Sequence, residues 1–121
     1  MTLQEIADEL VAGVRENRAK ENLGKLYAPD AVSVEALDMG GGREVKGVDA
    51  IRAKHDWWQN TVEWLGGDVE GPFPHGDDRF AVYYTMHTRD KDSGKEHHGK
   101  EVGLYHVADG KIVREEFFYC G

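Results

Sequence analysis

The chain has few of the features that cross-link or anchor proteins outside the cytoplasm. It contains a single cysteine, Cys120, which cannot form an internal disulfide bond and suits a reducing compartment. Its longest apolar runs are much shorter than the roughly 20 residues that span a bilayer. The first residues have no basic start and no apolar signal core. From these absences we expect a cytoplasmic protein.

Basic clusters are absent as well. The formal net charge is −8, whereas proteins that bind nucleic acid or anionic membranes usually present a concentrated basic surface. We therefore expect neither as a partner, and small neutral or cationic ligands remain open. The 121 residues are 40% hydrophobic and 31% charged, which is typical of one globular domain, here residues 1–121.

Helical patterns occupy much of the first half of the chain. Thr2 and Glu5 form a capping-box pattern, in which each side chain can satisfy a free amide of the first helical turn. Apolar residues then recur at helical spacing and predict a helix over residues 2–19. Similar reasoning predicts shorter helices over residues 20–27 and 48–60.

The remaining segments are rich in β-branched and aromatic residues and are separated by turn sequences. These patterns predict a short strand pair and then four longer strands that form an antiparallel meander. Helices packed on one face of such a sheet define an α+β domain. The predicted strands cover residues 31–36, 43–46, 61–74, 79–89, 95–107 and 111–119.

The terminal hairpin carries the residues of greatest functional interest. Asp-Gly at residues 109–110 is a strong hairpin signal. A three-residue loop with the glycine left-handed would pair Gly103 with Glu115 and Glu101 with Phe117. A two-residue turn would instead place Glu101 and Glu115 on opposite faces. Under the first pairing, one face would carry Glu101, Tyr105, Val113, Glu115, Phe117 and Tyr119.

Glutamates within half-buried strands have two interpretations. If Glu101 and Glu115 share an apolar pocket, at least one carboxyl should have a raised pKa and be able to act as a general acid or base. Alternatively, Glu101 forms an ion pair with lysine or arginine on the outer face of the sheet. Glu116 lies on the opposite parity and is predicted to be outward and solvated.

The histidines offer a proton relay rather than a metal site. His87 can face His97 across the predicted turn, and a single histidine, His87 above all, could pass a proton to a pocket carboxylate. A metal site needs three or four converging ligands, and no helical histidine pair is present. We therefore expect neither a metal ion nor an organic cofactor.

Aromatic residues supply the expected ligand contacts. The strand predicted over residues 79–89 has an apolar face that includes Phe80 and a mixed face that includes His87. The sequence leaves open which face lines a pocket. We place Glu101 on the mixed face, together with His87. The aromatic residues predicted to contact a ligand are Tyr27, Trp58, Phe73, Tyr84, Phe117 and Tyr119.

Three short motifs accompany the first helix in a characteristic order. They are Leu-Tyr-Ala-Pro-Asp-Ala-Val at residues 26–32, Lys-Gly-Val-Asp-Ala-Ile at 46–51 and Asp-Gly-Lys-Ile-Val at 109–113. Through them the whole chain resembles the NTF2-like superfamily, in particular its SnoaL-like proteins. The resemblance implies a cone in which three N-terminal helices pack on a strongly curved antiparallel sheet. It also implies an apolar pocket inside the cone and a homodimer formed through the sheet.

The resemblance does not extend to a known active site. The family's ketosteroid isomerases use a tyrosine on the first helix and an aspartate near the start of the sheet. The first helix here has no tyrosine, and Glu35 and Asp38 lie in no matching motif. Pocket chemistry in this family often sits on the last strand, which implies that Glu115 points into the cone.

These observations lead to two kinds of expected function. The first is a cofactor-free lyase, isomerase or hydrolase acting on a small apolar molecule, with Glu115 as acid or base and Glu101, His87 or Tyr105 assisting. The alternative is a non-catalytic small-molecule binding protein or a dimeric interaction module.

Overall fold

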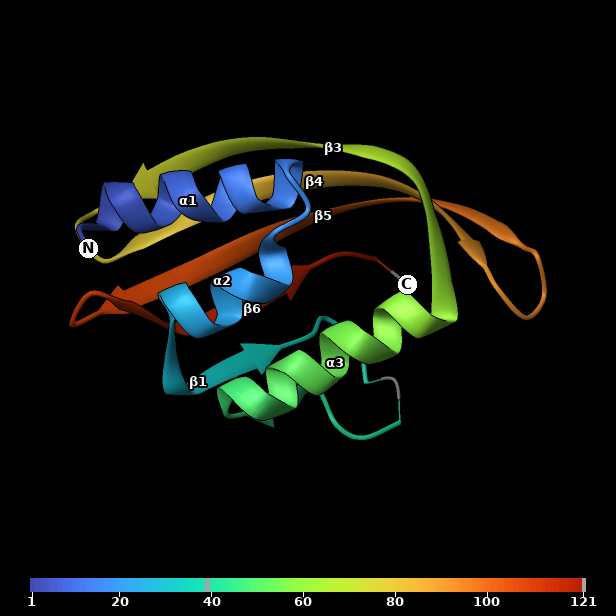
Figure 1. The fold of residues 1–121 in the computed structure, drawn as a ribbon, viewed down its shortest axis with the longest axis horizontal. Helices are drawn as coiled ribbons and strands as arrows, with labels where there is room; N and C mark the ends of the chain where they lie inside the picture. The colour runs from blue at the N-terminus through green and yellow to red at the C-terminus, as the bar shows by residue number, and fades with distance from the viewer. Residues whose placement is uncertain (39, 121) are drawn as a thin grey trace.

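Three helices and a six-stranded sheet make up the computed structural model, which describes residues 1–38 and 40–120 (Figure 1). None of the helices in these two ranges has the length and apolar character needed to cross a membrane. The helices are α1 (Leu3–Arg15), α2 (Ala19–Leu26) and α3 (Val48–Thr61). The strands are β1 (Tyr27–Val34), β2 (Glu44–Lys46), β3 (Val62–His75), β4 (Arg79–Asp90), β5 (Glu96–Ala108) and β6 (Lys111–Phe118).

The first helix begins as the sequence predicts and ends earlier. The Thr2 hydroxyl accepts a hydrogen bond from the Glu5 amide, and the Glu5 carboxylate accepts one from the Thr2 amide, which completes the capping box. After Arg15 the chain turns sharply, with Asn17 in the left-handed region at φ 59° and the Arg18 amide donating to the Gly13 carbonyl at 2.6 Å. This turn separates α1 from α2, whereas the spacing of apolar residues alone predicts a single helix as far as residue 19.

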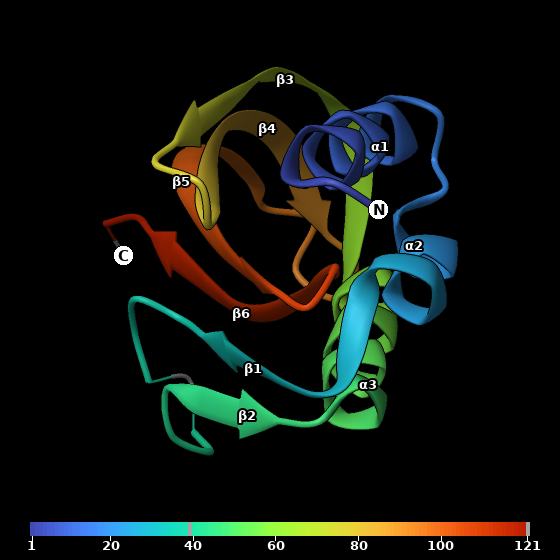
Figure 2. The ribbon, with the colours of Figure 1, turned by 90° about the vertical axis from the view of Figure 1, so that its left-hand side faces the viewer.

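The strands lie in the order β2-β1-β6-β5-β4-β3. The predicted antiparallel meander from β3 to β6 is confirmed. The first strand joins this meander next to the last one, and β1 runs parallel to β6. The sheet is strongly curved, and the three helices lie along its open side (Figure 2). The parallel contact was not predicted, because nothing local in the sequence identifies which edge of a meander receives an isolated strand.

Strand β1 starts at Tyr27, four residues before the predicted start. Pro29 lies inside it although proline cannot donate a ladder hydrogen bond. The register of β1 with β6 shifts between Tyr27 and Val32, and this irregularity accommodates the proline. As a result Tyr27 belongs to the sheet rather than to α2.

The terminal hairpin closes with a two-residue turn. Asp109 and Gly110 have positive φ angles of 52° and 74°, and Ala108 pairs with Lys111. A bulge between Val107 and His106 then shifts the register, so that Tyr105 pairs with Glu115. The predicted pairing of Gly103 with Glu115 was therefore wrong by two residues, and this even-numbered shift leaves Glu115 on the predicted face.

The same bulge changes which residue of β6 enters the core. Ile112 is fully buried in the hydrophobic cluster, whereas Val113, predicted to face inward, is only half-buried and lies outside that cluster. Gly103 pairs with Phe117, and from Glu115 onward the alternate residues of β6 that were predicted to face inward do so. The bulge compensates for the short turn, so that Glu101 and Glu115 share a face after all.

The hydrophobic core lies between the helices and the apolar face of β4. Phe80 and Val82 are fully buried there together with Ile6 of α1 and Leu23 of α2. The apolar parity of β4 therefore lines the interior. Tyr84 belongs to this parity and pairs with Glu101, so the assignment of Glu101 to the mixed face with His87 was wrong.

Candidate active site on the concave face of the sheet

Glu115 of β6 is the buried centre of a polar network. Its side chain is 1% exposed, and both carboxylate oxygens accept hydrogen bonds. The Tyr27 hydroxyl donates to one oxygen, and the Ser33 hydroxyl donates to the other at 2.6 Å. Ser33 reaches it because it is the register partner of Glu115 on the adjacent parallel strand. A buried carboxylate with hydroxyl donors on both oxygens is held in one orientation.

Lys54 of α3 extends this network toward solvent. Its ammonium group donates to the Ser33 hydroxyl at 2.6 Å and to the Glu35 carboxylate at 2.7 Å. The other Glu35 oxygen accepts a hydrogen bond from the Tyr119 hydroxyl at 2.9 Å. The ammonium nitrogen also lies 5.6 Å from the centroid of the Phe117 ring. One cation is thereby fixed on the concave face between the buried and the half-exposed carboxylates.

Glu101 of β5 is the carboxyl whose protonation is most perturbed. It is half-buried opposite Tyr84. Burial, together with the nearby negative charges of Glu35 and Glu115, raises its pKa to about 7, while the charge of Lys54 opposes the shift. Near neutral pH this carboxyl is therefore present in both its protonated and its ionised form.

Two tyrosines join the network from the neighbouring strands. The Tyr84 and Tyr105 hydroxyl oxygens lie 2.5 Å apart. The Tyr105 ring stacks on Phe80 with centroids 5.0 Å apart and meets Phe117 edge-on at 6.2 Å. Burial raises the pKa of both phenols above the usual value, so they remain protonated and able to donate hydrogen bonds at neutral pH.

His55 of α3 is a histidine whose pKa responds to the charge of the Glu115 carboxylate. It is half-buried, and desolvation lowers its pKa although the charge of Glu115 acts in the opposite direction. Its imidazole is therefore mainly neutral at pH 7. The sequence predicts His87, not His55, as the histidine that serves this carboxylate.

His87 lies elsewhere. It contacts Glu96 at 2.7 Å and stacks on His98 with ring centroids 4.1 Å apart, instead of facing His97. It lies seven residues along β4 from Phe80, the partner of Tyr105, which is roughly 23 Å at the rise of an extended strand. The structure does not bring His87 into the Glu115 network, because His87 lies on the face of β4 opposite to that of Tyr84, the partner of Glu101, and pairs with His98 toward the outer end of the strand.

Two of the predicted ligand contacts are also displaced. Trp58 is 39% exposed near the end of α3, and Phe73 is 53% exposed on β3, where it pairs with the outward residue Ala81. The structure does not bring either into the Glu115 network. It does bring together Tyr27, Tyr84, Tyr105, Phe117, Tyr119, Glu101 and Glu115.

Ser33, Lys54 and His55 were missed because their positions depend on long-range contacts. A weak signal existed for Ser33 and Glu35, since they interrupt the predicted first strand with polar residues at alternating positions. That alternation has no functional meaning until β1 is known to lie beside β6. In the described ranges, no group of three or more histidine, cysteine, aspartate or glutamate side chains is arranged to hold a metal ion.

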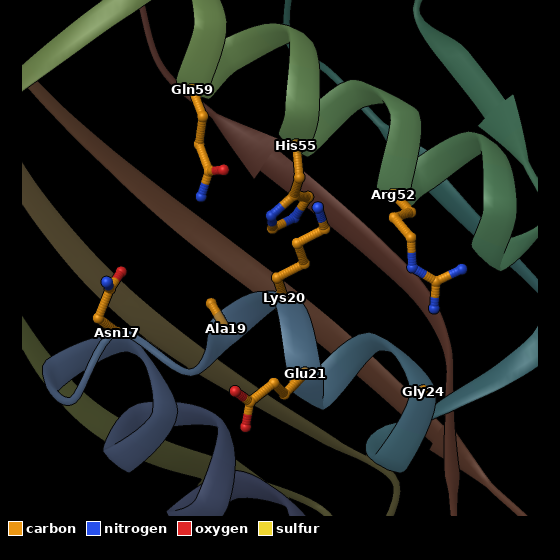
Figure 3. A pocket seen from close by; sticks show the side chains of 8 residues that line it. All are labelled: Asn17, Ala19, Lys20, Glu21, Gly24, Arg52, His55 and Gln59. Carbon is orange, nitrogen blue, oxygen red and sulfur yellow. The ribbon is translucent and has the colours of Figure 1, made fainter.

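A separate cavity of about 520 Å³ lies between α2 and α3, as Figure 3 shows. Arg52, His55 and Gln59 of α3 line one side of it, and residues of α2 and the preceding turn line the other. His55 thus borders this cavity and also lies close enough to Glu115 to feel its charge.

A curved sheet that carries polar side chains on its concave face and is closed by three helices defines an NTF2-like, or cystatin-like, domain. The chain belongs to the SnoaL-like domain family, whose pattern it matches over residues 1–119. No curated protein is significantly similar to it.

Solved structures agree with this assignment. A candidate SnoaL-like polyketide cyclase of Mesorhizobium loti is 37% identical, with 98% of this chain and 100% of that one covered and a TM-score of 0.91. An NTF2-like protein of Burkholderia thailandensis shares 16% identity, with 99% and 92% covered and a TM-score of 0.84. TerC, crystallised with polyporic acid, shares 22% identity, with 96% and 89% covered and a TM-score of 0.73.

Proposed function

We propose that this SnoaL-like protein is a cofactor-free acid–base catalyst that acts on a small, largely apolar molecule, with Glu101 as the proton-transfer group. The observation that carries the proposal is the position of Glu101. Its half-buried carboxyl lies on the concave face of the sheet, and its pKa is raised to about 7. A group that titrates near the working pH is the most effective general acid or base.

The surrounding side chains suit proton abstraction next to a carbonyl group. Ionised Glu101 would take a proton from the carbon beside the carbonyl, and the electron pair of that C–H bond would move toward the carbonyl oxygen to form an enolate. The Lys54 ammonium and the Tyr84–Tyr105 hydroxyl pair are the donors that could stabilise this oxygen. If a C=C bond adjoins the carbon that loses the proton, the enolate is conjugated with it, and return of the proton to the far carbon of that bond moves the C=C bond and completes an isomerisation.

Glu115 has a different role in this proposal from the acid–base role that the sequence favoured. Hydroxyl groups of Tyr27 and Ser33 occupy its two oxygens, and the carboxylate is fully buried. We therefore assign Glu115 the role of a positioning residue. It orients Tyr27 directly and Lys54 through the Ser33 hydroxyl. The aromatic side chains Tyr84, Phe117 and Tyr119 remain the proposed ligand contacts, together with Tyr27.

The comparisons support a small-molecule pocket. The Mesorhizobium loti protein is named as a candidate polyketide cyclase, and polyketides are carbonyl compounds. TerC was crystallised with the small molecule polyporic acid.

The test is hydrogen–deuterium exchange into a panel of small cyclic ketones, followed by NMR in deuterated buffer. The wild type should accelerate exchange next to the carbonyl, with a rate that rises through pH 7 as Glu101 ionises. The Glu101→Gln variant should lose this acceleration, whereas Glu101→Asp should retain part of it. Equal exchange by the wild type and Glu101→Gln would contradict the assignment of Glu101.

A non-catalytic binding protein is the second candidate, and the complete satisfaction of Glu115 favours it, because this network is stable without a reaction. Such a protein should be stabilised by its ligand in proportion to the logarithm of ligand concentration and should form no product. Thermal unfolding with the same ketone panel, measured beside the exchange experiment, separates the two functions.

We also propose that the protein is a cytoplasmic homodimer that associates through the outer face of the sheet. Tyr83, Val102 and Phe118 are cross-strand neighbours on β4, β5 and β6. Val102 and Phe118 remain 37% and 47% exposed in the isolated chain. Adjacent exposed apolar side chains of this kind are typical of a surface that is covered by a partner.

A further inference from the structure

The cavity between α2 and α3 has an unusual lining for the junction of two helices. Arg52, His55 and Gln59 follow one another at intervals of three and four residues and so share one face of α3. A helix face that meets a neighbouring helix is normally apolar and closely packed. Here the space of about 520 Å³ is open, and six of the eight residues that line it are polar or charged. Leaving such a junction unfilled forgoes apolar burial, which favours a binding role over a purely structural one.

Most of the side chains that enter the cavity are hydrogen-bond donors. In Figure 3, Arg52, His55 and Gln59 point from α3 toward α2, and Lys20 rises from α2 beside His55. The carboxylate of Glu21 lies on the side of the cavity nearer α1. The donors thus enter the cavity from both helices, with His55 and Lys20 between Gln59 and Arg52, so a ligand with several acceptor oxygens can be held from both sides.

We propose that this cavity is a second ligand site, separate from the Glu101 network, for a small molecule that presents carboxylate or phosphate oxygens. Arg52 can bind such a group with two parallel hydrogen bonds. Lys20 supplies a second positive charge, and the side chains of His55 and Gln59 can donate further hydrogen bonds.

The ion pairs already formed by the two cations do not prevent this binding. Lys20 contacts Asp56 at 2.6 Å and Arg52 contacts Asp49 at 2.9 Å. The Asp49 side chain is 94% exposed, and all four side chains of these pairs are more than a third exposed. Ion pairs of such accessible groups contribute little to stability. A ligand oxyanion that contacts Arg52 and Lys20 together can therefore replace them.

The overall charge does not oppose the proposal at short range. The chain carries a net charge of −8, but salt limits the reach of exposed charges to about 8 Å at physiological ionic strength. Within that distance an anion in the cavity meets Arg52 and Lys20, but also the carboxylates of Glu21, Asp56 and Asp49. Binding therefore requires the anion to take the place of Asp56 and Asp49 on the two cations.

Isothermal titration calorimetry with inorganic phosphate and with malonate tests the proposal, with chloride holding the ionic strength constant. We expect saturable binding of at least one of the two anions, and the anion that binds identifies the oxyanion class. A double variant, Arg52→Ala with Lys20→Ala, should weaken that binding at least tenfold. Lys95→Ala, which removes a lysine from the exposed β4–β5 turn, should leave it unchanged.

A second readout locates the site without relying on the folding of the double variant. In the wild type, titration with the bound anion should shift the NMR signals of the His55 ring and leave those of the exposed His75 in place. Absence of saturable binding by both anions would overturn the proposal, as would equal affinity of the wild type and a folded double variant. Glu101→Gln should bind the anion as the wild type does, so the outcome is independent of the proposed catalysis.

Discussion

Ser33 and Glu115 lie side by side on the parallel strands β1 and β6, and the Ser33 hydroxyl donates a hydrogen bond of 2.6 Å to the Glu115 carboxylate. The two residues are 82 positions apart in the sequence. This contact attaches the N-terminal strand, and through it Lys54 of α3, to the strand that carries the buried carboxylate. The polar network of the concave face therefore depends on the one parallel contact in the described part of the sheet.

Removal of the Tyr27 hydroxyl should destabilise the protein. In Tyr27→Phe the buried Glu115 carboxylate loses one of its two hydroxyl donors, and an unsatisfied buried polar group costs about 1–3 kcal/mol. Tyr119→Phe is the matched control, because its partner Glu35 is half-exposed and can bind water instead. Urea unfolding at pH 7 measures both. A loss in Tyr27→Phe no larger than in Tyr119→Phe would show that Glu115 does not depend on this donor.

The raised pKa of Glu101 should make stability depend on pH. The ordinary pKa is 4.5 and the folded value is about 7. As pH rises between these values, the unfolded chain releases the proton before the folded one, so ionisation of Glu101 lowers the free energy of unfolding. Glu101→Gln lacks this loss. Its stability relative to the wild type should thus increase from pH 4 to pH 8 by up to about 3 kcal/mol.

Urea unfolding of both proteins across this pH range measures the difference, in which the contributions of the other titrating groups cancel. A stability difference that is constant with pH would contradict the raised pKa.

Lys54 and Glu35 should move the pKa of Glu101 in opposite directions. The Lys54 charge lowers it and the Glu35 charge raises it. Lys54→Met should therefore increase the Glu101 pKa, whereas Glu35→Gln should decrease it. Titration of the Glu101 side-chain carboxyl carbon by NMR checks both variants. Shifts of the same sign in the two variants would show that a structural change, rather than charge, controls this pKa.

Gly103 should be sensitive to the addition of a single methyl group. A Cβ atom at this position would lie 2.9 Å from the Tyr105 ring and 3.2 Å from the Phe117 ring. Both rings are packed, so Gly103→Ala should destabilise the fold by about 1–3 kcal/mol. At Gly99 on the same strand the nearest atom would be the Met86 side chain at 3.4 Å. Gly99→Ala should therefore change stability by less than about 0.5 kcal/mol in thermal unfolding.

A charge on the outer face of the sheet should disrupt the proposed dimer. Val102→Glu places a carboxylate between Tyr83 and Phe118, where association would bury it unpaired. Sedimentation velocity at micromolar concentration should show a dimer for the wild type and a monomer for this variant. Trp57→Glu, at a 58% exposed position on α3, should remain dimeric. A monomeric wild type would contradict the proposal.

Much of the fold was predictable because its signals are local. The capping box of Thr2 and Glu5 and the turn at residues 109–110 act within a few residues. The boundaries of β3 to β6 and the meander that they form follow from alternating patterns and turn sequences in the same way, whereas the start of β1 does not. The bulge near His106 was not predictable, because it depends on how β6 fits between two neighbours.

The amino-acid sequence by itself determined the α+β class and the order of the elements, because both follow from local residue spacing. The inward position of Glu115 was implied by the resemblance to the family rather than by residue spacing. Tertiary structure alone decided the partners of this carboxylate. It brought Ser33 and Lys54 to the network, left His87 at the far end of β4 and placed Glu101 on the apolar face. The physical reason is that strand register and helix packing are set by the burial of the whole core, which no local pattern encodes.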